Sequence, residues 1–160
     1  MTPNDNSEFY ILFELSGTTY AVKSRDVQHM EMIDQITPVP NTPPFIEGIA
    51  FSRGQVVPAV NLRVRFGFPR QPHSLRTRLL IVRVGERTVG LIVDSAREFQ
   101  HIAPQAIQPA DEAMAGGSEP YLAGIAVSND RLILILNLAA ALNLGEIANP
   151  AILTEHATES

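Results

Sequence analysis

The segment that decides the fold is Gly48-Ile49-Ala50-Phe51-Ser52, which is followed after four residues by Val57-Pro58-Ala59-Val60-Asn61-Leu62. It has a second copy, Gly124-Ile125-Ala126-Val127-Ser128, followed after four residues by Ile133-Leu134-Ile135-Leu136-Asn137-Leu138. The two copies align without a gap, at the constant offset that separates Gly48 from Gly124. A repeat of this length indicates that the chain builds two similar structural units.

Each copy predicts a strand, a turn, a second strand and a short helix. The apolar runs end at Asn61 and Asn137. Asparagine is favoured immediately before a helix, because its side chain accepts a hydrogen bond from a free main-chain N–H of the first turn. We therefore expect Asn61 and Asn137 to cap the two short helices.

A weaker similarity joins residues 9–23 to residues 79–93, and each segment predicts a β-hairpin with a glycine in its turn. One helical turn, capped by Ser24, is expected over residues 24–30. The strands are short and rich in Val, Ile, Leu and Phe, with Gly or Pro at intervals of about 8–12 residues, which is typical of small barrels. We predict a mainly all-β fold of two similar barrels packed together, with short helices.

The composition indicates a folded chain. Of 160 residues, 45% are hydrophobic and 18% are charged, which is enough apolar surface for a core and too little charge for disorder. The longest strictly apolar run, residues 132–136, is far shorter than the ~20 residues that cross a bilayer, and the first residues lack a signal segment. We therefore expect a cytoplasmic protein without direct membrane insertion. The absence of cysteine excludes disulfides and thiolate chemistry.

The charge is unevenly distributed around a formal net value of −5. Between Gly48 and Gly85 there are no Asp or Glu residues but seven arginines, namely Arg53, Arg63, Arg65, Arg70, Arg76, Arg78 and Arg83. Clustered cations can bind nucleic acid, but the chain has a single lysine, and arginine is also enriched at protein–protein interfaces. We predict no nucleic-acid binding and an acidic protein partner.

The sequence predicts no catalytic residue, no cofactor-binding site and no metal site. The four histidines (His29, His73, His101 and His156) are scattered and lack metal-ligand spacing. Ser52 precedes Arg-Gly and does not lie in the Gly-x-Ser-x-Gly turn of hydrolases. Asp94 follows an apolar run, and an aspartate in this position usually accepts hydrogen bonds from turn amides.

An ordered set of segments across the chain resembles the CheW-like chemotaxis coupling proteins. The resemblance extends roughly from Glu8 to Glu146 and is carried by segments 9–15, 20–22, 26–28, 41–48, 53–63, 89–94 and 121–124. It implies two five-stranded SH3-like β-barrels in a single CheW-like domain over residues 1–147. We expect a first barrel at about 8–68, a second at about 77–145, and a C-terminal tail at 148–160, and exchange of strands between the barrels is left open.

The resemblance also implies a function. Family members are non-enzymatic adaptors that bind the regulatory domain of a CheA-type histidine kinase and the cytoplasmic tip of methyl-accepting chemoreceptors. We therefore expect a cytoplasmic adaptor without a cofactor, recruited to membrane-associated chemoreceptor arrays. Whether copies of the adaptor also bind one another in these arrays is left open. The alternative is an adaptor of a non-swimming system, controlling twitching pili or a surface-sensing second messenger, with altered receptor specificity.

The resemblance also points to individual residues that we expect to bind the receptor or to shape the backbone. Arg53 is the first candidate for receptor contact, because an arginine on a turn before an apolar strand can anchor an interface. Val27 and Val56 match positions associated with the family's receptor groove, and His29 occupies a position that is often acidic in the family. Asn61 stands where the family usually has Asp. Four glycines are expected to serve turns or close backbone approach: Gly48, Gly54, Gly90 and Gly124.

Overall fold

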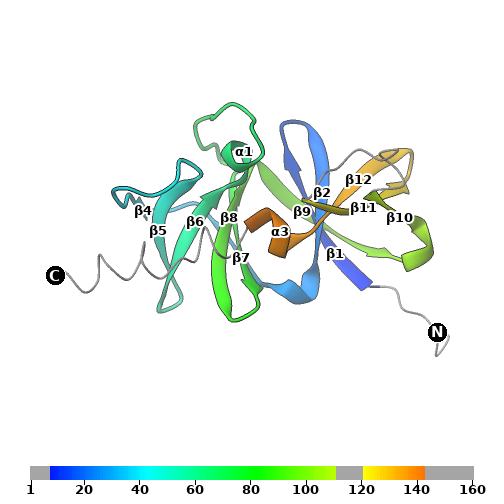
Figure 1. Ribbon diagram of the computed structural model, residues 1–160, viewed down its shortest axis with the longest axis horizontal. Helices are drawn as coiled ribbons and strands as arrows, with labels where there is room; N and C mark the ends of the chain where they lie inside the picture. Colours follow the sequence, from blue (N-terminus) through cyan, green and yellow to red (C-terminus); the bar gives the residue numbers. More distant parts are fainter. Residues whose placement is uncertain (1–7, 111–120, 143–160) are drawn as a thin grey trace.

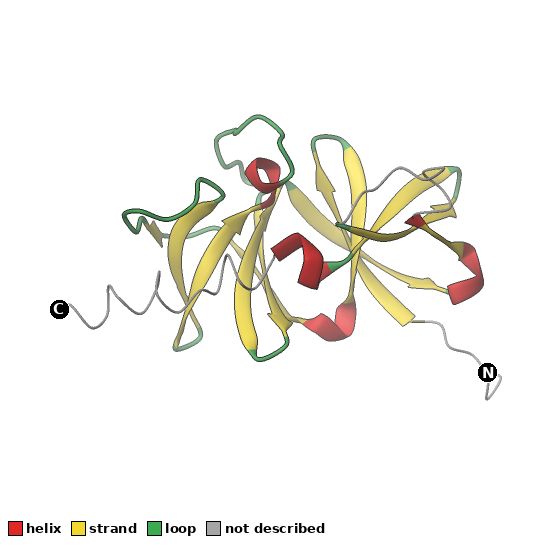
Figure 2. Cartoon of the chain, in the orientation of Figure 1, coloured by secondary structure: helices red, strands yellow, loops and turns green. Residues whose placement is uncertain are grey.

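The computed structural model describes residues 8–110 and 121–142, apart from the side chain of Arg97. Figure 1 shows two groups of strands side by side, with the helix α3 (Leu138–Leu142) between them. Each group is a six-stranded sheet in the described part of the chain. The predicted all-β fold of two packed units with short helices is confirmed (Figure 2).

The first sheet, here called barrel 1, contains six strands in the order β3-β7-β8-β6-β5-β4. Their bounds are β3 Val27–Met32, β4 Ile36–Thr37, β5 Ile46–Ser52, β6 Gln55–Asn61, β7 Arg78–Val84 and β8 Arg87–Val93. The second sheet, barrel 2, has the order β10-β11-β12-β2-β1-β9. Its bounds are β1 Glu8–Leu15, β2 Thr18–Lys23, β9 Ser95–Ile102, β10 Ile107–Pro109, β11 Leu122–Ser128 and β12 Arg131–Leu136.

Both copies of the sequence repeat form the predicted unit. In barrel 1, β5 and β6 lead into helix α1 (Leu62–Arg65), and in barrel 2, β11 and β12 lead into α3. The side chain of Asn61 accepts a hydrogen bond from Val64 N, and the side chain of Asn137 accepts one from Ala140 N, each at 3.2 Å. Both asparagines therefore occupy the capping position on which the two helices depend.

The sheets draw strands from both halves of the sequence. The amino-terminal hairpin β1–β2 pairs with β9 and, in parallel, with β12, so it lies in barrel 2. The hairpin β7–β8 pairs with β3 and, in parallel, with β6, so it lies in barrel 1. Each hairpin thus completes the barrel whose repeat unit lies in the other half of the chain.

Two local features differ from the sequence expectation. Each sheet has six strands among the described residues, where five were expected, because the short edge strands β4 and β10 also pair. The helical turn expected over 24–30 is restricted to the 3-10 turn η1 (Ser24–Asp26), and Ser24 does not cap it. Val27 begins β3, because pairing with β7 outweighs the weak helical preference of this segment. A second 3-10 turn, η2, spans Pro104–Ala106.

The largest apolar cluster lies between the two sheets and joins them. On β1, Ile11, Phe13 and Leu15 belong to this shared cluster, whereas the alternate residues Tyr10 and Leu12 belong to the interior of barrel 2. On β7, residues 80, 82 and 84 face the shared cluster, and residues 79 and 81 face the interior of barrel 1. Successive side chains of a strand point to opposite faces, so these strands are buried on both sides. The two barrels therefore form one unit.

No helix within the described residues has the length and apolar character required to cross a membrane.

Candidate protein-binding site

Arg53 and Gly54 form the two-residue turn that joins β5 to β6. Ser52 and Gln55 are paired across it, and the φ angles of Arg53 and Gly54 are 49° and 80°. Two consecutive left-handed residues define the type I′ turn, whose twist matches that of the flanking strands. A glycine adopts this conformation without steric cost, so Gly54 is suited to its position. The exposed side chain of Arg53 is carried at the tip of the hairpin.

Arg53 differs from the other arginines between Gly48 and Gly85 in its contacts. Six of the seven have partners within the chain: Arg63, Arg65, Arg70, Arg76, Arg78 and Arg83 bind main-chain carbonyls or carboxylates. For Arg53, no hydrogen bond or ion pair is found with any described residue. Most arginines of this segment therefore bind groups within the chain. Arg53, at the turn, has a guanidinium that no described residue binds.

Exposed apolar side chains lie on the hairpin that carries Arg53 and on β3. Phe51 and Val56 face each other across the hairpin and are 72% and 59% exposed. On β3, Met30 and Met32 are also exposed. We call these five residues (Arg53, Phe51, Val56, Met30 and Met32) the hairpin surface. An apolar group with an adjacent free arginine has the composition of a protein-binding surface.

His29 lies directly beneath this surface. Its Nε2 is 2.7 Å from Ser52 Oγ and 2.8 Å from Glu31 Oε2, and the Ser52 hydroxyl donates to the same Glu31 oxygen. Ser52 is buried, and His29 and Glu31 are mostly covered. The arrangement differs from a hydrolase triad, because Glu31 contacts the same imidazole nitrogen as Ser52 and so does not orient the ring through Nδ1.

The four residues expected to bind the receptor are not all at one point. His29, Arg53 and Val56 gather around the end of the β5–β6 hairpin, through the His29–Ser52 contact and the Phe51–Val56 pair. Val27, at the start of β3, is half-buried and packs against the cluster between the barrels.

A crevice of about 460 Å³ opens next to Val27, at the junction of the barrels. Asp26, the neighbour of Val27, lines it, together with Tyr10 of barrel 2 and Arg83 and Val84 of barrel 1. The walls are more apolar than polar, as a groove for an amphipathic helix requires.

Gly48 is required by close backbone approach. A Cβ atom at this position would lie 2.1 Å from the carbonyl oxygen of Thr37 on the neighbouring strand β4. The two other strand glycines, Gly90 on β8 and Gly124 on β11, likewise lie against neighbouring side chains.

Barrel 2 has a second exposed apolar surface. Val127 and Leu132 face each other across the β11–β12 hairpin, 63% and 60% exposed. In the alignment of the two copies they are the repeat equivalents of Phe51 and Val56. On β1 and β9, Phe9 and Phe99 are exposed and stacked, with ring centroids 6.0 Å apart. We call Phe9, Phe99, Val127 and Leu132 the second surface.

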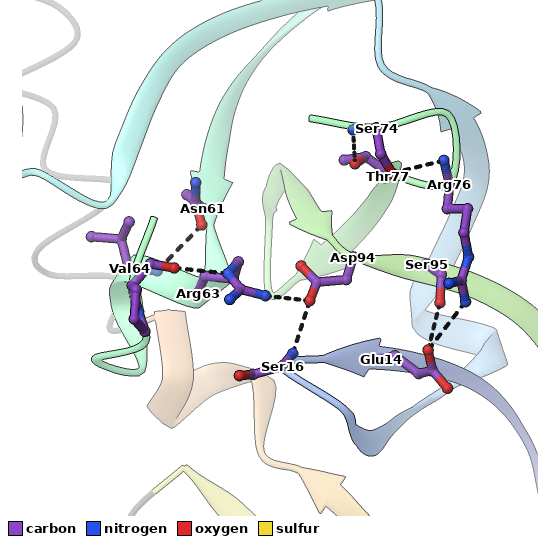
Figure 3. A network of polar contacts seen from close by, with 11 residues as sticks. Glu14, Ser16, Asn61, Arg63, Val64, Ser74, Arg76, Thr77, Asp94 and Ser95 are labelled. Carbon is purple, nitrogen blue, oxygen red and sulfur yellow. Dashed lines mark hydrogen bonds and ion pairs between the residues drawn. The ribbon is translucent and has the colours of Figure 1, made fainter. Parts of the chain in front are cut away.

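A polar network joins the barrels on the side of the loop 69–77 (Figure 3). The Arg63 guanidinium is paired with Asp94, which lies between β8 and β9 and also accepts from Ser16 N at 2.8 Å. The expectation that Asp94 binds turn amides is confirmed by this contact. Glu14 accepts from Ser95 at 3.1 Å and from Arg76 at 3.4 Å. These groups line a cleft of about 330 Å³ and satisfy one another, so the network acts as a joint between the barrels.

Among residues 8–110 and 121–142, no three side chains of the His, Asp and Glu types gather in a way that could hold a metal ion.

Sequence reasoning missed several residues of the site. Phe51 faces Val56 because the turn has two residues, so hairpin register alone could have identified this pair. Alternation along β3 could have placed His29 and Glu31 on one side and Met30 on the other. The contact of this strand with Ser52 had no local signal, since 21 residues separate Ser52 from Glu31.

Comparisons with known proteins agree with the architecture. The family model described as "CheW-like domain" matches residues 10–146. The chain is 29% identical to the chemotaxis protein CheW of Klebsiella aerogenes, with 87% of this chain and 84% of that protein covered. It is 31% identical to CheW of Helicobacter pylori, with coverages of 84% and 82%. It is 26% identical to the protein FrzA of Myxococcus xanthus, with coverages of 83% and 84%.

Among solved structures, the scaffolding protein TtCheW of Thermoanaerobacter tengcongensis superimposes with a TM-score of 0.76 and 30% identity, and the match covers 82% of this chain and 89% of that one. The fold is thus the pair of packed SH3-like barrels expected from the sequence resemblance. With the family model matching most of the chain, from residue 10 to residue 146, and the fold matching as well, the chain belongs to the CheW-like family of adaptor and scaffold proteins.

Proposed function

We propose that this protein is a non-enzymatic adaptor that couples methyl-accepting chemoreceptors to a CheA-type histidine kinase in a chemosensory array. The observation that carries the proposal is the presence of two exposed apolar surfaces, one on each barrel, in a chain of the CheW-like family. An adaptor needs two faces that can be occupied at the same time, and the two surfaces lie on separate barrels. The array would supply a high effective concentration, so that modest affinities suffice.

The receptor is assigned to barrel 1 and the adjoining crevice. The helical tip of a receptor would lie in the crevice near Val27 and extend along β3 to the hairpin surface. There Arg53 would pair with a carboxylate or a helix-end carbonyl, while Phe51 and Val56 supply apolar contact. Arg53 suits this role because it is exposed and no described residue competes for its guanidinium.

The kinase regulatory domain is assigned to the second surface on barrel 2. Its flank carries the exposed ion pair of Arg131 and Glu98, with distances of 3.0 and 3.3 Å. An apolar centre with a polar rim is the usual anatomy of a protein interface. The two partners would then bind without overlap.

An adaptor role without catalysis is supported by the geometry at Ser52. The Ser52 hydroxyl already donates its hydrogen to Glu31, and Ser52 Oγ accepts a hydrogen bond from His29 Nε2. Because Nε2 carries a hydrogen, the imidazole cannot remove the serine proton through this nitrogen. We further propose that the protein acts in the cytoplasm, at membrane-associated arrays. Two of the three relatives described above are named chemotaxis proteins, which favours a chemotaxis pathway over control of pili or a second messenger.

The test is a pull-down from native cytoplasm with the tagged chain, in which partners are identified by mass spectrometry. Wild-type protein should recover a CheA-type kinase and a chemoreceptor. Arg53→Glu should lose the receptor and keep the kinase, whereas Val127→Ser should lose the kinase and keep the receptor, because each changes one exposed surface.

Arg76→Gln is the control, because Arg76 is 62% exposed and belongs to neither surface, and glutamine removes its charge without placing a second carboxylate beside Glu14. It should retain both partners. Recovery of neither partner by the wild-type chain would refute the adaptor role, and equal loss of both partners in Arg53→Glu would refute the assignment of faces.

A further inference from the structure

We propose that His29, Ser52 and Glu31 form a latch that closes barrel 1 beside the turn of the β5–β6 hairpin and positions Arg53 for its partner. This inference rests on the proposed function in one respect, the role of Arg53 in receptor binding. The latch itself follows from contacts within the chain.

The latch joins two strands that do not pair. In the strand order of barrel 1, β7, β8 and β6 lie between β3, which carries His29 and Glu31, and β5, which ends at Ser52. The contacts of Ser52 with His29 at 2.7 Å and with Glu31 therefore bridge the two sides of the sheet. They lie at the last residue of β5, immediately before the turn.

The donors and acceptors of the latch are fully matched. A carboxylate can only accept, so the Ser52 hydroxyl donates its single hydrogen to Glu31. Ser52 Oγ must then accept from His29 Nε2, which carries a hydrogen and also lies 2.8 Å from Glu31. Because Ser52 is only 4% exposed, water cannot readily replace a lost partner.

The repeat provides an internal comparison. Ser128, the repeat equivalent of Ser52, ends β11 and accepts a hydrogen bond from Gln100 of β9, so barrel 2 is bridged at the equivalent point. In barrel 2 the bridge is a hydrogen bond between two neutral groups, the Gln100 amide and the Ser128 hydroxyl. In barrel 1 it includes a histidine and a carboxylate, and the turn that follows carries Arg53 where barrel 2 has Asn129.

The latch acts on Arg53 through the main chain. Arg53 has a φ of 49°, a left-handed conformation that is uncommon for a residue with a Cβ and that the two-residue turn requires. Ser52, held from the side by β3, fixes the strand end from which this turn starts. Its release should allow the tip to leave this conformation, and Arg53 would then lose its fixed direction.

Hydrogen exchange of the full-length chain tests the latch. Ser52→Ala removes the shared hydroxyl, and His29→Leu removes the donor, so each should accelerate amide exchange of residues 51–56 by about tenfold or more. His29→Gln retains an N–H donor and should restore slow exchange. Ser128→Ala is the matched control in barrel 2 and should leave residues 51–56 unchanged. Thermal unfolding identifies any variant that fails to fold. If Ser52→Ala fails to fold, the exchange rates of His29→Leu and His29→Gln decide whether the latch exists: equal rates in the two variants would contradict it.

The binding assay separates this inference from the proposed function. With the chemoreceptor captured by the wild-type chain as probe, Ser52→Ala and His29→Leu should weaken binding, and His29→Gln should recover it. Wild-type exchange at residues 51–56 in Ser52→Ala would overturn the latch. Full binding by Ser52→Ala together with loss of binding by Arg53→Glu would overturn its positioning role. Full binding by Arg53→Glu would overturn the receptor face itself, while the exchange data would still decide on the latch.

Discussion

Phe45 and Tyr121 occupy the same position in the two repeat units and face the same arginine. The carbonyl of each accepts a hydrogen bond of 2.7 Å from the N–H of the asparagine that caps the next helix, Asn61 or Asn137. The Arg65 guanidinium lies 4.6 Å from the centroid of the Phe45 ring and 5.3 Å from that of Tyr121. The two repeat units therefore share the Arg65 side chain as a common contact.

Replacing Arg65 should weaken the junction of the barrels. Its Nε also donates to Ala141 O at 2.7 Å, so Arg65→Ala removes both a hydrogen bond and the ring contacts. We expect a loss of about 2 kcal/mol in the free energy of unfolding, and a smaller loss for Arg65→Lys, which keeps the charge. Urea unfolding measures the difference. Arg83→Ala, which removes only a 3.3 Å contact to Gly85 O, should change little, and an equal effect of the two alanine variants would contradict this role.

A methyl group at Gly48 should be strongly destabilising. The new Cβ would lie 2.1 Å from Thr37 O and 2.9 Å from Pro38 Cα, so β4 would have to move. We expect Gly48→Ala to cost about 3 kcal/mol. Gly17→Ala is the control, because Gly17 has a φ of 82° but no atom within 4 Å of its Cβ position. It should cost only the left-handed strain of about 1 kcal/mol. Thermal unfolding of both variants would reveal whether close approach decides the outcome.

The ion pair of Arg63 and Asp94 should contribute more to stability than a surface pair. The Arg63 side chain is only 9% exposed, so Asp94→Asn leaves a nearly buried cation without its carboxylate. Since the Asp94 side chain is itself 32% exposed, solvent screens part of the pair. We therefore expect Asp94→Asn to lower the free energy of unfolding by about 2–3 kcal/mol, which is no more than the smallest losses typical of fully buried pairs. Glu98→Gln breaks the exposed pair with Arg131 and should cost less than about 1 kcal/mol. Chemical denaturation measures both losses. Equal losses for Asp94→Asn and Glu98→Gln would contradict a larger contribution of the Arg63–Asp94 pair.

Tyr10 should make the fold sensitive to alkaline pH. Burial raises the pKa of the Tyr10 phenol above 10.0, and the negative charge of Glu8 adds to this effect. The unfolded chain therefore loses this proton before the folded protein does. The contribution is fully present below pH 10 and is lost as pH rises through the folded pKa. Between pH 9 and 11 the free energy of unfolding should fall more for wild type than for Tyr10→Phe, and parallel curves would contradict the pKa direction.

Much of the fold could be predicted from local patterns. The repeat, its hairpins and its capped helices depend on residues near each other in the chain, so Asn61, Asn137 and the turn at Arg53-Gly54 are readable from sequence alone. The exposed pair of Phe51 and Val56 follows from the same hairpin register. Local preference failed at residues 27–30, where pairing with β7 imposed a strand.

The sequence by itself determined that the chain contains two copies of one β unit and that Arg53 stands at a hairpin tip. Only the tertiary structure decided which hairpin completes which barrel, which arginines are consumed by internal contacts, and that Ser52 meets His29 and Glu31. These outcomes depend on contacts between residues that lie far apart in the chain, such as the Ser16 main-chain N–H and the Asp94 carboxylate, which are separated by 78 positions. Such pairs are selected by packing between the two sheets, and packing leaves no periodic pattern in the sequence.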